Sequence, residues 1–151
     1  MDLLAEMTGV AAALADAAVP FAIVGGVAMG FYVKARTTLD LDILIDETDL
    51  PRARAAIADL GFLPYGPEFL SGTGATRIRR FAKTAGADFL VLDCLMADNA
   101  TRPALADPVR VEFRGVTLPV AARSVLVELK SRRASAQDRA DIEMLREGHN
   151  A

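Results

Sequence analysis

The sequence predicts an α+β, or mixed α/β, fold. Apolar residues recur at helical spacing near the N-terminus, short apolar strands alternate with turns through the middle, and the last third of the chain returns to a helical pattern. Helices on either side of a run of strands are typical of a sheet flanked by helices. The glycines lie at turns and no linker divides the chain, so we expect a single domain over residues 1–151.

The first third of the chain predicts two helices and two strands. Pro20 ends the N-terminal amphipathic helix and begins a buried strand, and a glycine pair separates that strand from the next helix. In chain order the expected elements are a helix, a strand, a helix and a strand: Asp2–Ala18, Phe21–Val24, Val27–Lys34 and Leu39–Ile45.

The remainder predicts a third helix, a pair of strands, a hairpin and two C-terminal helices. Thr48 or Asp49 caps the third helix, which ends at Leu60 before Gly61. The later elements are Thr76–Phe81, Phe89–Met96, Val109–Phe113, Val116–Val120, Arg123–Arg133 and Gln137–Arg146. Loops are expected at Gly66–Gly74, Ala82–Ala87 and Pro103–Pro108.

Composition excludes several classes of function. The net charge of −3 argues against a broad non-specific nucleic-acid surface, although a local basic groove remains open. One cysteine and one histidine exclude an internal disulfide and a Cys/His zinc site within one chain. No apolar run approaches the roughly 18 residues of a membrane helix, and the N-terminus lacks the basic segment of a signal peptide. We therefore expect a cytoplasmic protein without a membrane partner.

Two aspartates share one face of the Leu39–Ile45 strand. Asp40 and Asp42 are two residues apart, so their side chains project on the same side, while Leu39, Leu41 and Ile43 take the other. Like charges held this close are tolerated only when they are exposed or share a cation. Next to a glycine turn that opens a helix, such a pair forms a workable metal and phosphate site; the alternative is a half-exposed strand with its polar face outward.

A metal-dependent phosphoryl transfer site needs a third carboxylate on a neighbouring strand. Asp93 is the best candidate, because it lies among apolar residues of the Phe89–Met96 strand, where an unpaired charge would be costly. Asp88 is a weaker candidate, since it begins that strand and could simply face water.

The motif Gly25-Gly26, followed by Arg36-Thr37-Thr38 and Asp40-Leu41-Asp42, resembles the nucleotidyltransferase superfamily that includes DNA polymerase β. The nearest resemblance is to its minimal members and to the toxin-type enzymes of abortive-infection systems. It implies a nucleotidyltransferase-like mixed sheet flanked by helices, with further helices at the C-terminus. It also implies that Asp40, Asp42 and Asp93 bind two Mg²⁺ ions, and that Asp93 helps to activate the incoming hydroxyl.

The same resemblance suggests residues that bind the nucleotide. Gly25 and Gly26 would let backbone amides approach phosphate at a helix N-terminus, although a plain strand-to-helix turn explains them as well. Arg36 either contacts phosphate or pairs with a carboxylate, and Thr38 leads into the acidic strand.

The C-terminal segment is the second point of resemblance. The toxin-type pattern implies that Lys130 contacts the nucleotide phosphates and that Asp138 supports it, although Gln137 replaces a common basic residue. The alternative is a solvated amphipathic helix with Ser135 capping near Asp138. Asp141 is expected to face solvent or to pair with an arginine.

Four basic residues, Arg77, Arg79, Arg80 and Lys83, form a local cluster in the sequence. They could steer nucleotide or RNA toward a site, but an exposed hairpin face is slightly favoured. Cys94 alternates away from Asp93 along its strand and is expected in the core.

These observations predict a metal-dependent nucleotidyltransferase that moves an NMP from an NTP to an acceptor hydroxyl. The acceptor is RNA such as tRNA, a protein side chain or a small molecule, and membership of a toxin–antitoxin or defence pair suggests a cognate partner protein. The alternative is a catalytically silent relative that acts as a binding or antitoxin-like module, favoured if Asp93 points away from Asp40 and Asp42. A third, weaker possibility is a sensor that binds NTP without turning it over.

Overall fold

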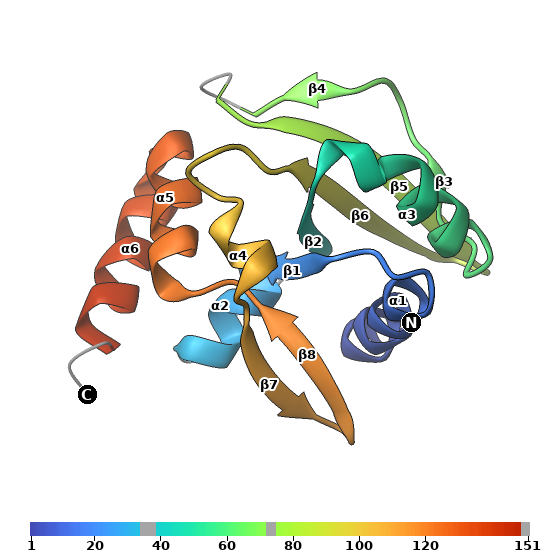
Figure 1. Ribbon diagram of the computed structural model, residues 1–151, viewed down its shortest axis with the longest axis horizontal. Helices are drawn as coiled ribbons and strands as arrows, with labels where there is room; N and C mark the ends of the chain where they lie inside the picture. Colours follow the sequence, from blue (N-terminus) through green and yellow to red (C-terminus); the bar gives the residue numbers. More distant parts are fainter. Residues whose placement is uncertain (34–38, 72–74, 149–151) are drawn as a thin grey trace.

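The computed structural model describes residues 1–33, 39–71 and 75–148. Helices and strands follow the predicted order, with two additional short strands and two additional short helical segments (Figure 1). In chain order these elements are α1 (Leu3–Asp16), β1 (Phe21–Val24), α2 (Gly25–Tyr32), β2 (Asp40–Ile45), η1 (Glu47–Asp49), α3 (Leu50–Ala58), β3 (Leu63–Pro64), β4 (Phe69–Leu70), β5 (Arg77–Ala85), β6 (Asp88–Met96), α4 (Pro103–Ala106), β7 (Val109–Phe113), β8 (Val116–Val120), α5 (Arg123–Arg133) and α6 (Ala136–Gly148).

The strands form one mixed sheet, which confirms the predicted fold class. Across the described residues its order is β3-β5-β6-β2-β1-β8-β7, and β4 pairs with the outer side of β5. β2 runs parallel to β6 and β1 parallel to β8, whereas β1 and β2 are antiparallel. The central strands β1, β2 and β6 are therefore adjacent, although β6 comes much later in the chain than the other two.

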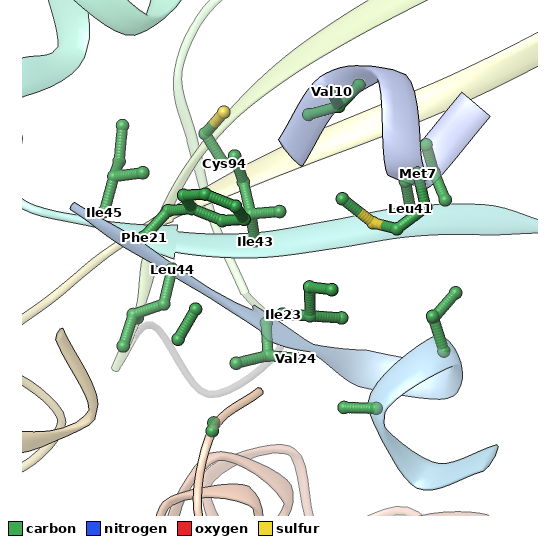
Figure 2. Packing of buried hydrophobic residues seen from close by; sticks show 14 of the residues in the cluster. Met7, Val10, Phe21, Ile23, Val24, Leu41, Ile43, Leu44, Ile45 and Cys94 are labelled. Carbon is green, nitrogen blue, oxygen red and sulfur yellow. The ribbon is translucent and has the colours of Figure 1, made fainter. Parts of the chain in front are cut away.

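The part of the hydrophobic core that fixes the orientation of β2 lies between the sheet and α1. Asp2 caps this helix by accepting hydrogen bonds from the Leu4 and Ala5 amides, which fixes where the helix begins. Met7 and Val10 then face the sheet and pack near Leu41 and Ile43 of β2 (Figure 2). All four side chains are fully buried. Because side chains alternate along a strand, burying one face of β2 directs its aspartates to the opposite face.

The C-terminal helices flank that opposite face. α5 and α6 lie side by side, and in Figure 1 they stand apart from α1 and α3. Ala134, with φ of 56°, ends α5 in the left-handed region and allows the chain to reverse into α6. Helices thus flank the sheet, and the site described below lies between the sheet and α5.

The predicted turn at Ala82–Ala87 is wrong. β5 continues to Ala85, which pairs with Asp88 at the start of β6, so that only Gly86 and Ala87 form the turn. Gly86 has φ of 61°, a conformation that suits tight hairpin turns. The strands are therefore longer than predicted, and their register is fixed by the turn.

Several boundaries also differ from prediction. β4 lies within the predicted loop at Gly66–Gly74 because it pairs with β5 at the sheet edge. α4 lies within the predicted loop at Pro103–Pro108, where Pro103 suits the first turn of a helix. α2 begins two residues earlier than predicted, directly at Gly25.

Other elements match prediction closely. β1, β7, β8 and α5 have the predicted bounds, and Arg114 and Gly115 form the β7–β8 turn. Cys94 is fully buried in the core, as expected from its position beside Asp93.

Among the described residues, every helix is too short or too polar to cross a membrane.

Candidate active site

Charged side chains form a row across three neighbouring strands. Arg80 of β5 pairs in register with Asp93 of β6, and Asp93 pairs in register with Asp42 of β2. Paired residues project from the same face of a sheet, and adjacent strands lie about 4.8 Å apart. Asp42 is paired in turn with Val24, the last residue of β1 before Gly25. We use the name charged row for this line across the sheet, which consists of Arg80, Asp93, Asp42, Val24 and the adjacent Gly25.

Asp40 extends the acidic part of the charged row. It lies two residues before Asp42, on the same face of β2, and pairs in register with Val91. Asp40 and Asp42 are half-buried, while Leu41 and Ile43 on the other face are fully buried. The predicted arrangement of Asp40, Asp42 and Asp93 on one face of adjacent strands is therefore present in the geometry.

Gly25 is required by the position of Asp42. Its φ of +69° lies in the left-handed region. A Cβ at this position would stand 2.8 Å from Cγ of Asp42 and nearer still to Oδ2. The absent side chain therefore lets the Asp42 carboxylate lie directly against the first turn of α2. Gly26 follows inside the same helix.

The pKa values of the two β2 carboxyls are raised. Burial is the largest cause of the rise in the pKa of Asp42 to about 7, and the charges of Asp93 and Asp40 add to it. Burial and then the charge of Asp93 raise the pKa of Asp40, against the effect of Arg80. Asp42 has no hydrogen bond or ion pair to any of the described residues. A cation placed here would favour the charged form of both groups.

Asp93, in contrast, is fully paired with Arg80. Nε and Nη2 of Arg80 donate hydrogen bonds of 2.8 and 2.9 Å to the two carboxylate oxygens of Asp93. Asp93 is buried, and this two-bond geometry gives an arginine–carboxylate pair both strength and a fixed orientation. Arg80 also lies over the ring of Phe69, 5.0 Å from its centroid.

The acids of the charged row do not form a ready-made metal cage. Within residues 1–33, 39–71 and 75–148, no three His, Cys, Asp or Glu side chains are grouped closely enough to hold a metal ion. Asp40 and Asp42 nevertheless fit a hard cation such as Mg²⁺, because both offer carboxylate oxygens from the same half-buried face of β2. Asp93 keeps unused lone pairs on both oxygens while it is bound to Arg80.

Lys130 points into the same cleft, but its main partner is not the predicted one. Its ammonium group lies 2.8 Å from Oδ2 of Asp141 and 4.0 Å from Oδ1 of Asp138. Asp141 is completely buried and also accepts a hydrogen bond from Gln137. The prediction that Asp141 faces solvent is wrong, because the buried lysine needs a buried counter-charge.

Asp138 lies in the first turn of α6 and forms a capping box with Ser135, the residue before the helix. The Ser135 hydroxyl accepts a hydrogen bond from the Asp138 amide, and the Asp138 carboxylate accepts bonds from the amide and hydroxyl of Ser135. Arg133 approaches the same carboxylate at 3.5 Å. The Ser135 cap of the predicted alternative is thus present, but this side of the helix is not solvated, because Asp138 and Asp141 are buried. Asp138 remains close enough to Lys130 to add to its negative surroundings.

A cleft of about 280 Å³ joins these groups. It lies between the charged face of the sheet, the end of β4 and the inner side of α5. Its lining residues are Val24, Gly25, Asp40, Asp42, Phe69, Ser71, Thr76, Ile78, Arg80, Asp93, Leu95, Leu126, Leu129, Lys130 and Arg133. Arg36 and Thr38, which the sequence places beside the nucleotide, lie outside the described residues.

The local basic cluster is divided among separate partners. Arg77 pairs with Glu47 and Glu68, and Lys83 pairs with Glu6. Arg80 alone among the four basic residues lines the cleft. Asp88, the weaker acidic candidate, accepts a hydrogen bond from the N-terminal amine and lies outside the cleft.

A Gly25→Ala substitution should destabilise the protein by more than about 1 kcal/mol, because it combines a left-handed φ with a clash against Asp42. Thermal unfolding measures the loss. Gly9→Ala is the matched control in α1, where an added Cβ meets no atom within 4 Å, and it should be neutral or stabilising. If the clash matters, Gly25→Ala should cost less in an Asp42→Ala background; an equal cost in both backgrounds would refute it.

The raised pKa of Asp42 predicts a pH-dependent stability. The folded protein holds a proton on Asp42 up to about pH 7, whereas the unfolded chain releases it near the ordinary value of 3.8. Metal-free protein should therefore lose stability as the pH rises from about 4 to about 7, by at most on the order of 4 kcal/mol. Asp42→Asn should flatten this loss and be more stable than the wild type at pH 8.

Urea unfolding at several pH values tests this expectation, with Glu143→Gln on the exposed side of α6 as a control for the loss of one negative charge. Identical pH slopes for the wild type and Asp42→Asn would show that Asp42 does not titrate in this range.

Comparison with known proteins places the fold. No protein-family model and no curated protein sequence matches this chain. Among solved structures, the solution structure of the antibiotic-resistance factor ANT(2'')-Ia is similar, with a TM-score of 0.62 and 17% identity over 96% of this chain and 84% of that chain. ANT(2'')-Ia in complex with adenylyl-2''-tobramycin gives a TM-score of 0.60 and 15% identity, over 93% and 86% of the two chains.

The lincomycin-bound lincosamide antibiotic adenylyltransferase LnuA is also similar, with a TM-score of 0.54 and 13% identity over 88% of this chain and 89% of that chain. At these identities the likeness concerns the fold. The chain therefore has the nucleotidyltransferase fold that these antibiotic-modifying proteins share.

Proposed function

We propose that this protein is a nucleotidyltransferase, which transfers an NMP from an NTP to an acceptor hydroxyl. The observation that carries the proposal is the charged row, in which carboxylates lie between anion-binding groups and an arginine. The fold shared with antibiotic nucleotidyltransferases supports it. The order of groups along the charged row also supports placing each substrate at a different end of the cleft.

The triphosphate would bind at the β1 end of the charged row. α2 begins there at Gly25, and a helix N-terminus presents free amides and a partial positive charge to an anion. Lys130 and Arg133 reach the cleft from α5 and supply two positive side chains. The buried pair with Asp141 would hold Lys130 in place, while the largely exposed Arg133 side chain is free to adjust to the ligand.

Asp40, Asp42 and Asp93 would hold Mg²⁺, the two β2 carboxylates most directly. Bound Mg²⁺ supplies neutralisation of phosphate charge as the pyrophosphate leaves. The raised pKa of Asp42 supports such a site, because burial and the charges of Asp93 and Asp40 disfavour its charged form, which a bound cation would favour. Two metal ions would require Asp93 to share its lone pairs between Arg80 and the metal.

In the transfer, the acceptor oxygen forms a bond to the α-phosphorus of the NTP. The bond between the α-phosphorus and the bridging oxygen breaks, and pyrophosphate leaves. Asp93 would accept the hydroxyl proton, because it faces the cleft from the strand beside Asp42. Arg80 acts through Asp93 by fixing the orientation of its two oxygens.

A small molecule is the acceptor that we favour among those the sequence allows. ANT(2'')-Ia is known with adenylyl-2''-tobramycin and LnuA with lincomycin, and both compounds are small molecules. Transfer to tRNA or protein, and a toxin–antitoxin partnership, draw no support from the described residues.

The Arg80–Asp93 pair also favours a second candidate function. If both Asp93 oxygens stay bound to Arg80 throughout, the Asp93 carboxylate is not available to a proton or a metal ion. The cleft would then bind nucleotide without transferring it. This is the catalytically silent module or sensor, with the same fold and the same phosphate end.

Isothermal titration of each NTP, with Mg²⁺ and with EDTA, tests the proposal. We expect Mg²⁺-dependent binding that weakens at least roughly tenfold in Asp40→Asn and Asp42→Asn. Glu143→Gln should bind as the wild type does. Retained binding in both β2 variants, or equal binding in EDTA, would refute a metal–nucleotide site on β2. Mg²⁺-dependent binding without pyrophosphate release toward any hydroxyl compound would favour the silent module.

A further inference from the structure

The end of the cleft beyond Asp93 is lined by an aromatic ring, a hydroxyl and a guanidinium group. Phe69 and Ser71 come from β4 and the residue after it, and Arg80 comes from β5. The Ser71 hydroxyl is buried and has no hydrogen-bond partner among the described residues. A buried hydroxyl without a partner costs free energy unless a ligand or water satisfies it. We call Phe69, Ser71 and Arg80 the β4 wall.

Arg80 retains hydrogen-bonding capacity in this wall. A guanidinium group carries five N–H donors, and the bonds to Asp93 use two of them. Its face rests on the Phe69 ring, which fixes its plane without using a donor. The Arg80 side chain is about one third exposed and lines the cleft, so a ligand that enters the cleft can reach it.

The charge of the cleft discriminates between acceptors. Apart from Asp40, Asp42 and Asp93, no acidic side chain of the described chain lines it, whereas Arg80, Lys130 and Arg133 do. Nearby acids outside the cleft are already paired, as Glu47 and Glu68 are with Arg77. The ammonium group of an amino sugar bound beside the β4 wall would therefore lie near the Arg80 guanidinium, without a further carboxylate in the cleft to pair with.

We propose that the acceptor binds against the β4 wall and is an uncharged or anionic hydroxyl compound with an apolar face, rather than an amino sugar. The Phe69 ring would pack against the apolar face, the Ser71 hydroxyl would bond to a ligand hydroxyl, and Arg80 would bind a carboxylate or a neutral oxygen. This inference rests on the proposed function, because it is the position of Asp93 that makes this end of the cleft the acceptor end.

Three matched probes test the charge preference: 4-nitrophenyl β-D-glucuronide, glucoside and glucosaminide. They share an aromatic ring and sugar hydroxyls, and they are anionic, neutral and cationic respectively. Each is titrated into the full chain with Mg²⁺ and a non-hydrolysable ATP analogue, and amide shifts on β4 and β5 are followed by NMR. We expect the glucuronide to bind best and the glucosaminide at least roughly tenfold more weakly.

Variants assign the preference to the β4 wall. Arg80→Gln should remove most of the difference between the three probes, and Phe69→Ala should weaken all of them. Arg79→Gln is the matched control, since Arg79 lies on the same strand but outside the cleft. Ser71→Ala is the variant of choice if Arg80→Gln unfolds, because it removes only the hydroxyl; it should weaken the glucoside and the glucuronide.

The outcomes separate this inference from the proposed function. If the ATP analogue does not bind, the proposed function fails and this inference with it. If the analogue binds, three results would overturn the inference alone: preferential binding of the glucosaminide, no binding of any probe up to millimolar concentration, or shifts confined to residues away from β4 and β5.

Discussion

The close approach of the Asp42 carboxylate to Gly25 is the constraint on which the site depends. The contact requires a glycine with a left-handed φ at the first residue of α2, and it brings a carboxylate against a helix N-terminus. It also leaves Asp42 half-buried beside Asp40 and Asp93, which raises its pKa to about 7. A buried carboxyl with a raised pKa is typical of functional sites, and the cation of the proposed site would favour the charged form of Asp42.

The rest of the fold holds this contact in place from both sides of the sheet. The face of β2 that carries Leu41 and Ile43 is buried against α1. The strand therefore cannot turn its aspartates inward without exposing these two apolar side chains. On the other face, the buried Lys130–Asp141 pair joins α5 to α6. Such a pair contributes little net stability, but its loss would leave a buried charge, which helps to fix how the two helices meet.

Most of the central structure could be predicted because it depends on local patterns. The alternation of apolar and acidic residues in Leu39–Ile45 fixes which face Asp40 and Asp42 take, and an isolated Asp93 in an apolar strand is conspicuous. Both inferences needed only the two-residue period of a strand. That β6 lies beside β2 was expected from the family resemblance, since a parallel neighbour distant in sequence leaves no local signal.

The features that were missed depend on register and on tertiary burial. Arg80 faces Asp93 because the β5–β6 turn contains only Gly86 and Ala87, and the longer turn that was predicted concealed this pairing. A strict search for a two-residue turn at Gly86 would have revealed it. Asp141 resembles any polar residue on an amphipathic helix, and its burial follows from how α6 packs against α5.

The most direct test of a cation and nucleotide site at Asp42 is an NMR titration of its side-chain carboxyl, with and without Mg²⁺ and ATP. We expect the carboxyl to titrate near pH 7 in the metal-free protein and at clearly lower pH once Mg²⁺ and ATP are bound, because the cation favours the charged form. A carboxyl that titrates near 3.8 and does not respond to Mg²⁺ and ATP would contradict the assignment of the site.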